Sequence, residues 1–498
     1  METRALRSAP VRLTVGVLRR AAKALAYALG GAFVVLLAVG IRYLESRPDL
    51  RVWHQVNLDT EFTARSELAS LAEYLALEDR LFEQLAGELE LLPADRTQLN
   101  RYHEGSLADP GRWPVAWNRS FEWVPESPDW PDSPVASVLL LHGMSDSPYS
   151  LRHLAEALHA RGARVLGLRL PGHGTAPSGL VTVHWRDMAA AVTLGLRHLR
   201  ERAAGGPVYV IGYSNGGALA VVHAIAALED PSLPQVDGMV LISPSIGVTK
   251  LAVFAVWQAR LGVLLGLPKL AWSSILPEFD PFKYGSFAMN AGDQVFRLTA
   301  EIGAGLDRLE ADGRIQDFPP VLAFQSLTDA TVSTRAVLDR LFLRLPGEGH
   351  TLVFFDLNRF AASEGMLRAD PREAIQAELA GRTLSFDFDL ITNENGTSSR
   401  VVLRHKRAGQ TEVEVEPLGL AWPRGLYSLA HISLPFPEGD SLYGGPGASE
   451  SPGIALGWQE LRGERGVLVV SAADLMRLRW NPFYRVIEER VLASFGLD

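Results

Sequence analysis

The strongest chemical signal in the sequence is a serine enclosed by glycines. Residues 212–217 read Gly-Tyr-Ser-Asn-Gly-Gly, after the apolar run 208–211 and before an alanine-rich segment. In this context G-x-S-x-G forms a strand-to-helix turn so tight that glycine is needed beside the serine, whose hydroxyl is lifted clear of the sheet. Ser214 is therefore the predicted nucleophile. The next N–H, that of Asn215, lies at a helix start and is predicted to stabilise an oxyanion.

A carboxylate that could orient a catalytic histidine follows a later apolar run. Asp329 comes shortly after residues 321–324 and is the predicted acid. A carboxylate in that role holds the histidine in one tautomer and stabilises its charged form. Asp356, which follows the run 352–355, is the competing carboxylate, and its position is more typical of a turn former.

The elements that must position these residues alternate along the chain. Short runs that are apolar throughout are typical of strands buried on both faces, and the helical patterns between them predict a parallel sheet between helix layers. In such a sheet the chemistry lies at the carboxyl ends of the strands. The expected strands are residues 138–141, 165–170, 208–211, 239–242, 321–324 and 352–355, and the expected helices are residues 149–160, 185–202, 215–228 and 334–345.

Three histidines follow Asp329, and the chain order of serine, acid and histidine restricts the base to them. His350 precedes a strand, which would place it about 16 Å from the active edge of the sheet at about 3.3 Å per residue. His405 lies in the basic, strand-like segment 400–406, which is more typical of a solvated face. His431 is the predicted base, with His350 as the second choice.

Three segments resemble the lysophospholipase and monoacylglycerol-lipase branch of the α/β-hydrolases, a branch that includes proline-type aminopeptidases. They are Leu-Pro-Gly-His-Gly-Thr at 170–175, His-Gly at 142–143 and the Gly-Tyr-Ser-Asn-Gly turn. The resemblance covers residues 137–331. It implies an α/β-hydrolase fold and a cofactor-free esterase or lipase that acts through an acyl-enzyme.

The same resemblance implies roles for individual residues. The backbone N–H of Met144, directly after His-Gly, would be the second oxyanion donor beside that of Asn215. His142 and His173 would be structural. Ser-x-x-His at 428–431 resembles the histidine loop of these enzymes and supports the choice of His431.

Two segments depart from a minimal domain of this kind. Residues 245–318 hold no strand of the expected sheet and begin with an apolar helical stretch, which predicts a helical cap over an acyl pocket. Residues 358–426 separate the last expected core strand from His431. Their three alternating runs, at 384–390, 400–406 and 411–416, predict a β-rich insertion that returns the histidine to the site.

The N-terminus predicts a membrane anchor. Residues 24–41 are uncharged and apolar, and a basic leader at 1–23 precedes them, which favours a single span at 24–44 with a cytoplasmic N-terminus and an extracytoplasmic catalytic domain. A cleaved signal peptide and a buried helix are the alternatives. An extension at 45–134, expected to be helix and loop, would link the anchor to a hydrolase domain at 135–498.

The composition excludes several classes of function. A net charge of −9 over 498 residues gives no basic surface for nucleic acid, and the absence of cysteine removes thiolate ligands and nucleophiles. No cofactor or metal is expected. The predicted function is a membrane-anchored serine hydrolase that cleaves lipid-like carboxylic esters of the lysophospholipid or monoacylglycerol type. A peptidase, an acyltransferase or a catalytically silent binding protein of the same fold remains the alternative.

Overall fold

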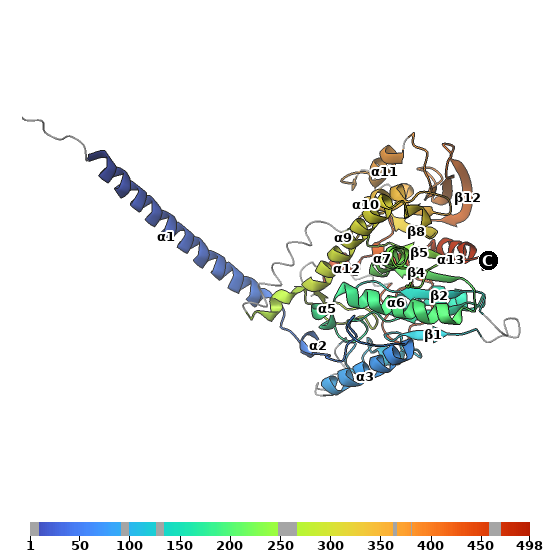
Figure 1. Ribbon diagram of the computed structural model, residues 1–498, viewed down its shortest axis with the longest axis horizontal. Helices are drawn as coiled ribbons and strands as arrows, with labels where there is room; N and C mark the ends of the chain where they lie inside the picture. The colour runs from blue at the N-terminus through green and yellow to red at the C-terminus, as the bar shows by residue number, and fades with distance from the viewer. Residues whose placement is uncertain are drawn as a thin grey trace, which may run out of the picture. The chain divides into compact units, whose positions relative to one another are not determined.

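The computed structural model describes residues 9–90, 99–125, 134–247, 266–361, 366–379, 381–457 and 470–498. They divide into two units, one ending at Leu50 and one from Arg51 to Asp498 (Figure 1). Residues 248–265, which include most of the apolar stretch of the predicted cap, lie outside the described residues. So do residues 1–8 of the predicted leader.

The first unit contains one long helix, α1 (Ala9–Ser46), which includes the predicted anchor at 24–44. Most of its described large apolar side chains are exposed, among them Leu25, Leu29 and Val34. No helix in the described part of the chain combines the length and hydropathy of a membrane span. The predicted anchor is therefore not confirmed by the structure.

The second unit is built around a ten-stranded sheet, and the predicted α/β architecture is confirmed. The strand order is β1-β3-β2-β4-β5-β8-β9-β10-β11-β12, and the strands from β3 to β10 run parallel. Its central strands are buried on both faces, as their apolar runs require. These strands are β2 (Ser137–Leu141), β3 (Arg164–Leu168), β4 (Val208–Tyr213), β5 (Gly238–Ile242), β8 (Val321–Ser326) and β9 (Thr351–Phe355).

Helices cover both faces of this sheet (Figure 1). On one face α6 (Trp185–Arg202), α7 (Asn215–Glu229) and α9 (Met289–Ala311) pack together, and on the other α4 (Arg152–His159) packs against α13 (Tyr484–Ser494). Further helices in the described part of this unit are α5 (Gly179–Thr182), α10 (Thr334–Arg340), α11 (Pro371–Leu379) and α12 (Ala472–Leu475), with short 3-10 turns at Pro148–Leu151, Pro268–Ala271, Ile315–Asp317, Phe342–Arg344, Arg359–Ala361 and His431–Ser433.

The described part of the predicted cap contains more than helix. A two-stranded sheet of β6 (Trp272–Ser274) and β7 (Phe287–Ala288) precedes α9. Because α9 packs against α7, it belongs to the helical layer of the main sheet. A methyl group at Gly305 of α9 would lie 2.7 Å from the side chain of Ile225, so glycine permits this close approach. The bounds of the cap at 245–318 stay a prediction.

The late insertion extends the main sheet instead of folding apart from it. β10 (Asp387–Asn393) pairs in parallel with β9, and β11 (Arg400–Lys406) and β12 (Glu414–Ala421) continue it antiparallel. The predicted bounds of β11 agree with the structure, while β10 and β12 lie about three residues C-terminal to their predicted positions. The insertion thus adds three strands beyond the expected edge.

The N-terminal extension is part of the second unit. It contains α2 (Val52–Gln55), α3 (Leu71–Leu89), a 3-10 turn at Pro110–Arg112 and β1 (Phe121–Trp123). The prediction of helix and loop for the extension omits β1, which pairs antiparallel with β3 and forms one edge of the sheet. A strand of three residues gives too short a pattern for sequence periodicity to detect.

Candidate active site

The turn between β4 and α7 holds Ser214 in a strained conformation. Its φ of 53° and ψ of −112° lie outside the regions that L-residues ordinarily adopt. The neighbouring glycines are required by close packing, since a methyl group at Gly216 would lie 2.1 Å from the carbonyl oxygen of Leu141 and one at Gly212 would lie 2.5 Å from Gly216. The strain persists because the surrounding sheet and helix hold the turn, and it presents the hydroxyl at the carboxyl edge of the sheet.

His431 lies between Ser214 and Asp329, within hydrogen-bond distance of both. Its Nε2 is 3.1 Å from the Oγ of Ser214, and its Nδ1 is 2.7 Å from the Oδ2 of Asp329. Because the carboxylate only accepts, Nδ1 carries the proton and Nε2 is free to accept the serine proton. The structure thus brings together the three side chains that the sequence singled out. This arrangement can activate a hydroxyl nucleophile.

Asp329 is held as a carboxylate by a full set of donors. The Oδ1 atom accepts from the N–H groups of Thr331 and Val332, at 2.8 and 3.0 Å, and Oδ2 accepts from the side-chain amide of Gln325 at 2.9 Å. Burial alone would raise the pKa of Asp329. The charge and hydrogen bond of His431, with the two backbone donors, outweigh it and lower the pKa. The group is therefore ionised at neutral pH.

Hydrogen bonds attach the loop that carries His431 to residues that follow the core strands β8 and β9 or end them. The hydroxyls of Ser326 and Thr328, beside Asp329, both donate to the carbonyl oxygen of Leu429, at 2.9 and 3.2 Å. Asn358, which follows β9, donates from its backbone N–H to the carbonyl oxygen of residue 427 and from its side-chain amide to that of residue 426. These bonds fix the histidine beside its acid, although a long stretch of chain separates them.

The predicted oxyanion donors flank Ser214. A methyl group at Gly143 would lie 3.3 Å from the Cβ of Ser214, so the loop that carries Met144 lies against Ser214. Asn215 is fully buried at the first position of α7. Among the described residues neither Met144 N–H nor Asn215 N–H has a hydrogen-bond acceptor. Two free backbone donors beside a nucleophile are what an oxyanion requires.

His142 stabilises the loop of Met144. Its Nδ1 donates to the carbonyl oxygen of Gly143 at 2.8 Å, and its Nε2 accepts from the N–H of Leu170 at 3.0 Å. Burial, followed by the nearby charge of His173, lowers the pKa of His142 well below its usual value. A neutral imidazole with both nitrogens engaged suits a structural role.

Two further residues contact the predicted catalytic groups, and no sequence motif marks either of them. The hydroxyl of Ser245 lies 3.3 Å from that of Ser214, and the amide of Gln325 contacts Asp329. Ser245 reaches the nucleophile because its own N–H donates to the carbonyl oxygen of Ser214 at 3.0 Å. Gln325 lies near the end of a core strand and Ser245 follows one, and many residues with a purely structural role have such positions. Only their contacts in the folded structure distinguish these two residues from the others.

The rejected candidates lie in other settings. His350 precedes β9, at the opposite edge of the sheet from Ser214, as expected from the strand direction. His405 pairs with Asp389, which is buried and also contacts Arg490. Asp356 is bound by Arg359 through two hydrogen bonds, at 2.8 and 3.1 Å, and therefore stabilises the loop after β9.

A buried ion cluster joins the extension to the loop 170–175. Arg169 is fully buried and forms a bidentate pair with Glu61, at 3.0 and 2.9 Å, and a third bond with Glu78 at 3.1 Å. The same guanidinium donates to the carbonyl oxygen of His173 at 2.9 Å. The extension thereby supports the loop whose Leu170 N–H holds His142.

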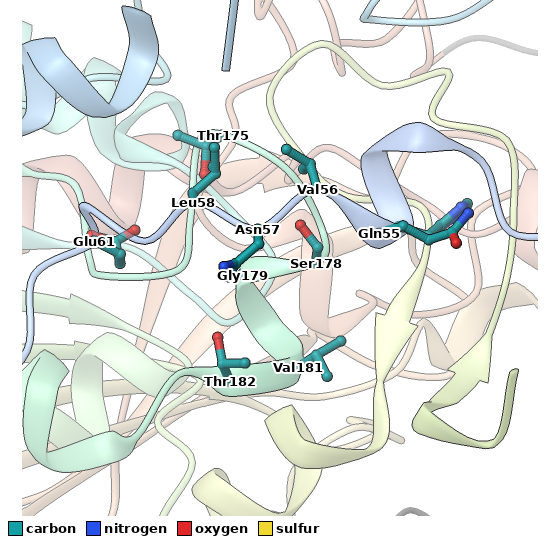
Figure 2. A pocket seen from close by; sticks show the side chains of 11 residues that line it. Gln55, Val56, Asn57, Leu58, Glu61, Thr175, Ser178, Gly179, Val181 and Thr182 are labelled. Carbon is teal, nitrogen blue, oxygen red and sulfur yellow. The ribbon is translucent and has the colours of Figure 1, made fainter. Parts of the chain in front are cut away.

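The seam between the extension and this loop contains a cavity of about 170 Å³. The lining residues are 54–58 and 61 of the extension together with 175, 178, 179, 181 and 182, and Figure 2 shows how they surround the cavity. Ser214, Asp329 and His431 are not among the residues that line it. The groups of His, Asp and Glu in the described part of the chain include none arranged to hold a metal ion.

Known proteins resemble part of this chain. Residues 132–356 match the family model of serine aminopeptidase, S33. A thermostable monoacylglycerol lipase of Bacillus sp. (strain H-257) is 28% identical over 182 residues, which are 36% of this chain and 69% of the relative. The family match includes Ser214 and Asp329 and ends before His431, so the predicted base lies outside the matched segment.

Among solved structures, a monoacylglycerol lipase of Paleococcus ferrophilus is 17% identical, covering 48% of this chain and 88% of its own, with a TM-score of 0.35. A soluble variant of the monoglyceride lipase of Saccharomyces cerevisiae is 15% identical, covering 48% and 82%, with a TM-score of 0.36.

Proposed function

Because the chain is a serine hydrolase with an α/β-hydrolase domain that resembles the serine aminopeptidase S33 family, we propose that it cleaves carboxylic esters of lipid-like substrates through Ser214. The observation that carries the proposal is the continuous hydrogen-bonded line from Ser214 through His431 to Asp329. The substrate class rests on the similarity to a monoacylglycerol lipase.

The proposed reaction has two halves. The Nε2 of His431 takes the proton of Ser214 as the hydroxyl oxygen attacks the ester carbonyl, and the resulting oxyanion accepts from the N–H groups of Met144 and Asn215. The imidazolium, stabilised by Asp329, returns the proton to the leaving alcohol and the acyl-enzyme remains. Water, activated by the same nitrogen, attacks the acyl carbonyl and releases the carboxylic acid and the free serine.

An association of α1 with a lipid bilayer, with the catalytic unit on the extracytoplasmic side, is part of the proposal. The exposed apolar side chains of α1 and the uncharged run 24–41 after basic residues support it. The test is extraction of membranes with alkaline carbonate from cells that express the full chain. Retention in the pellet supports an anchor, and release of the wild type into the supernatant refutes it. A Val34→Arg, Val35→Arg double variant should shift the chain to the supernatant.

Hydrolysis of p-nitrophenyl esters from acetate to palmitate tests the main proposal, with aminoacyl arylamides as the peptidase comparison and added alcohol as the acyltransferase comparison. We expect ester turnover that rises with acyl length and disappears in Ser214→Ala. The matched control is Ser245→Ala, which removes the neighbouring hydroxyl and should retain most activity. Preferred cleavage of arylamides favours a peptidase, preferred transfer to alcohol favours an acyltransferase, and no turnover by folded protein favours a silent binding protein.

A further inference from the structure

The late insertion creates a second cavity, distinct from the catalytic residues. It lies between α11 and the strands β10 and β11 and has a volume of about 190 Å³. Residues 372, 375, 376 and 379 of α11 line it, a spacing of three and four that puts all of them on one face of the helix. The cavity therefore lies between a helix face and a sheet face.

The sheet side of the cavity combines apolar and cationic side chains. Phe388 lies opposite Lys406 and Leu390 lies opposite Arg404 in the antiparallel register, and directly opposed residues share a face. All four line the cavity. The apolar side chains form its floor, while Arg404 is exposed at its rim and Lys406 is buried.

The positive charge of this face is incompletely neutralised. Lys406 donates to the backbone carbonyl of Arg382, and none of the described carboxylates forms an ion pair with it. In the part of the chain that the structure describes, the side chain of Arg404, a residue of β11, forms neither an ion pair nor a hydrogen bond. Arg372 has a buried Nε without a partner and lies 3.7 Å from Asp356, which already accepts two bonds from an arginine.

The carboxylates of the two strands lie elsewhere. Asp389 and His405 alternate with the cavity residues, bond to each other and face the opposite side of the sheet. Glu414, opposite His405 in the register, also lies on that side and pairs with Arg407. An anion that entered the cavity would meet cations without competing acids from these strands.

We propose that this cavity binds the carboxylate and first part of the chain of a free long-chain fatty acid, with Arg404 and Arg372 at the carboxylate and the floor of Phe388 and Leu390 at the chain. Apolar walls with a few convergent polar groups are the usual composition of a small-molecule site, and arginine suits a carboxylate because its fork donates two parallel bonds. The site goes beyond the proposed hydrolysis and does not depend on it.

The cavity also reaches the loop of the catalytic acid. Leu327 lines it, is nearly fully buried and stands two residues before Asp329. A bound chain would therefore contact a residue of the turn that positions the carboxylate. If the chain hydrolyses long-chain esters as proposed, the bound ligand belongs to the same chemical class as the acid released.

Photocrosslinking tests the proposal on the purified full chain. The probe is dodecanoate that carries a diazirine, and mass spectrometry locates the modified peptides. We expect adducts on α11 or on the β10–β11 hairpin, removed by excess dodecanoate but not by dodecanol. Arg404→Gln should weaken labelling about tenfold, since it removes a charged hydrogen-bond donor. Arg400→Gln, on the same strand but outside the cavity, is the matched control and should label as the wild type does.

A second variant separates loss of binding from loss of folding. Leu390→Trp would fill the floor and should abolish these adducts, and thermal unfolding shows whether the variant is folded. Adducts confined to other peptides, equal labelling of Arg404→Gln, or equal competition by dodecanol would each overturn the proposal. Because labelling requires no turnover, its result does not depend on whether the protein hydrolyses esters.

Discussion

Replacing Asp329 with asparagine tests the proposed role of the acid most sharply. The two oxygens of Asp329 together accept four hydrogen bonds, from Thr331 N–H, Val332 N–H, Gln325 and His431. Whichever way the amide is turned, its NH₂ group faces two donors. The amide orientation that keeps both backbone hydrogen bonds places the NH₂ group against Nδ1 of His431. Nδ1 must then accept a hydrogen bond, so the imidazole carries its proton on Nε2.

A histidine protonated on Nε2 cannot accept the proton of Ser214. The wrong tautomer costs about 10⁴ in kcat in a serine protease whose acid was changed in this way, so we expect a loss of about 10³–10⁴, or about 4–5 kcal/mol of activation free energy. The assay is single-turnover acylation by p-nitrophenyl butyrate, with thermal unfolding as the check on folding. Asp356→Asn is the comparison, because it should lower stability and leave acylation by the folded protein within a few fold. A folded Asp329→Asn protein that acylates within tenfold of wild type would refute the reasoning.

Three further predictions concern the supports of the site. Glu61→Gln breaks a buried pair with Arg169 and should lower the free energy of unfolding by about 3–5 kcal/mol in denaturant titrations, and a loss under 1 kcal/mol would contradict the pairing. Gly216→Ala would press a methyl group against the carbonyl oxygen of Leu141, so we expect about 4 kcal/mol of destabilisation or no folded protein; normal stability would contradict the packing. His54 has its pKa lowered from the usual 6.5 to about 4, by burial first and the charge of Arg51 second. As the pH falls, the His54 imidazole is protonated in the unfolded chain before it is protonated in the folded one. The free energy of unfolding should therefore fall by about 3 kcal/mol between pH 6.5 and pH 4. His54→Gln should remove most of that fall, and an unchanged pH dependence would assign it to other groups.

The parts of the fold that depend on local pattern could be predicted from the sequence. The helix at 185–202 and the strand at 400–406 have the predicted bounds, because each is long or regular enough for its periodicity to show. The glycine turn around Ser214 was equally readable, since its constraint is local. His431 was chosen in spite of a long insertion because strand direction disfavoured His350 and because the segment 428–431 resembles the histidine loop of known lipases.

The parts that depend on distant partners could not be predicted. The insertion has strand patterns, but no pattern states that β10 adds to β9, and the sheet is therefore wider than expected. Strand β1 was missed because three residues carry too little periodicity. The position of Ser245 at the site was missed because it depends on one contact with Ser214 across two strand ends. The anchor at 24–44 and the catalytic roles of the site residues stay predictions.

The central claim is that His431 activates Ser214 as a nucleophile. Its most direct test is the rate of labelling by a fluorophosphonate probe in wild type, Ser214→Ala and His431→Ala. The account predicts rapid labelling of the wild type, none of the serine variant and a loss of at least about 10³ in the histidine variant. Labelling of folded His431→Ala at the wild-type rate, or of Ser214→Ala at any other serine, would contradict it.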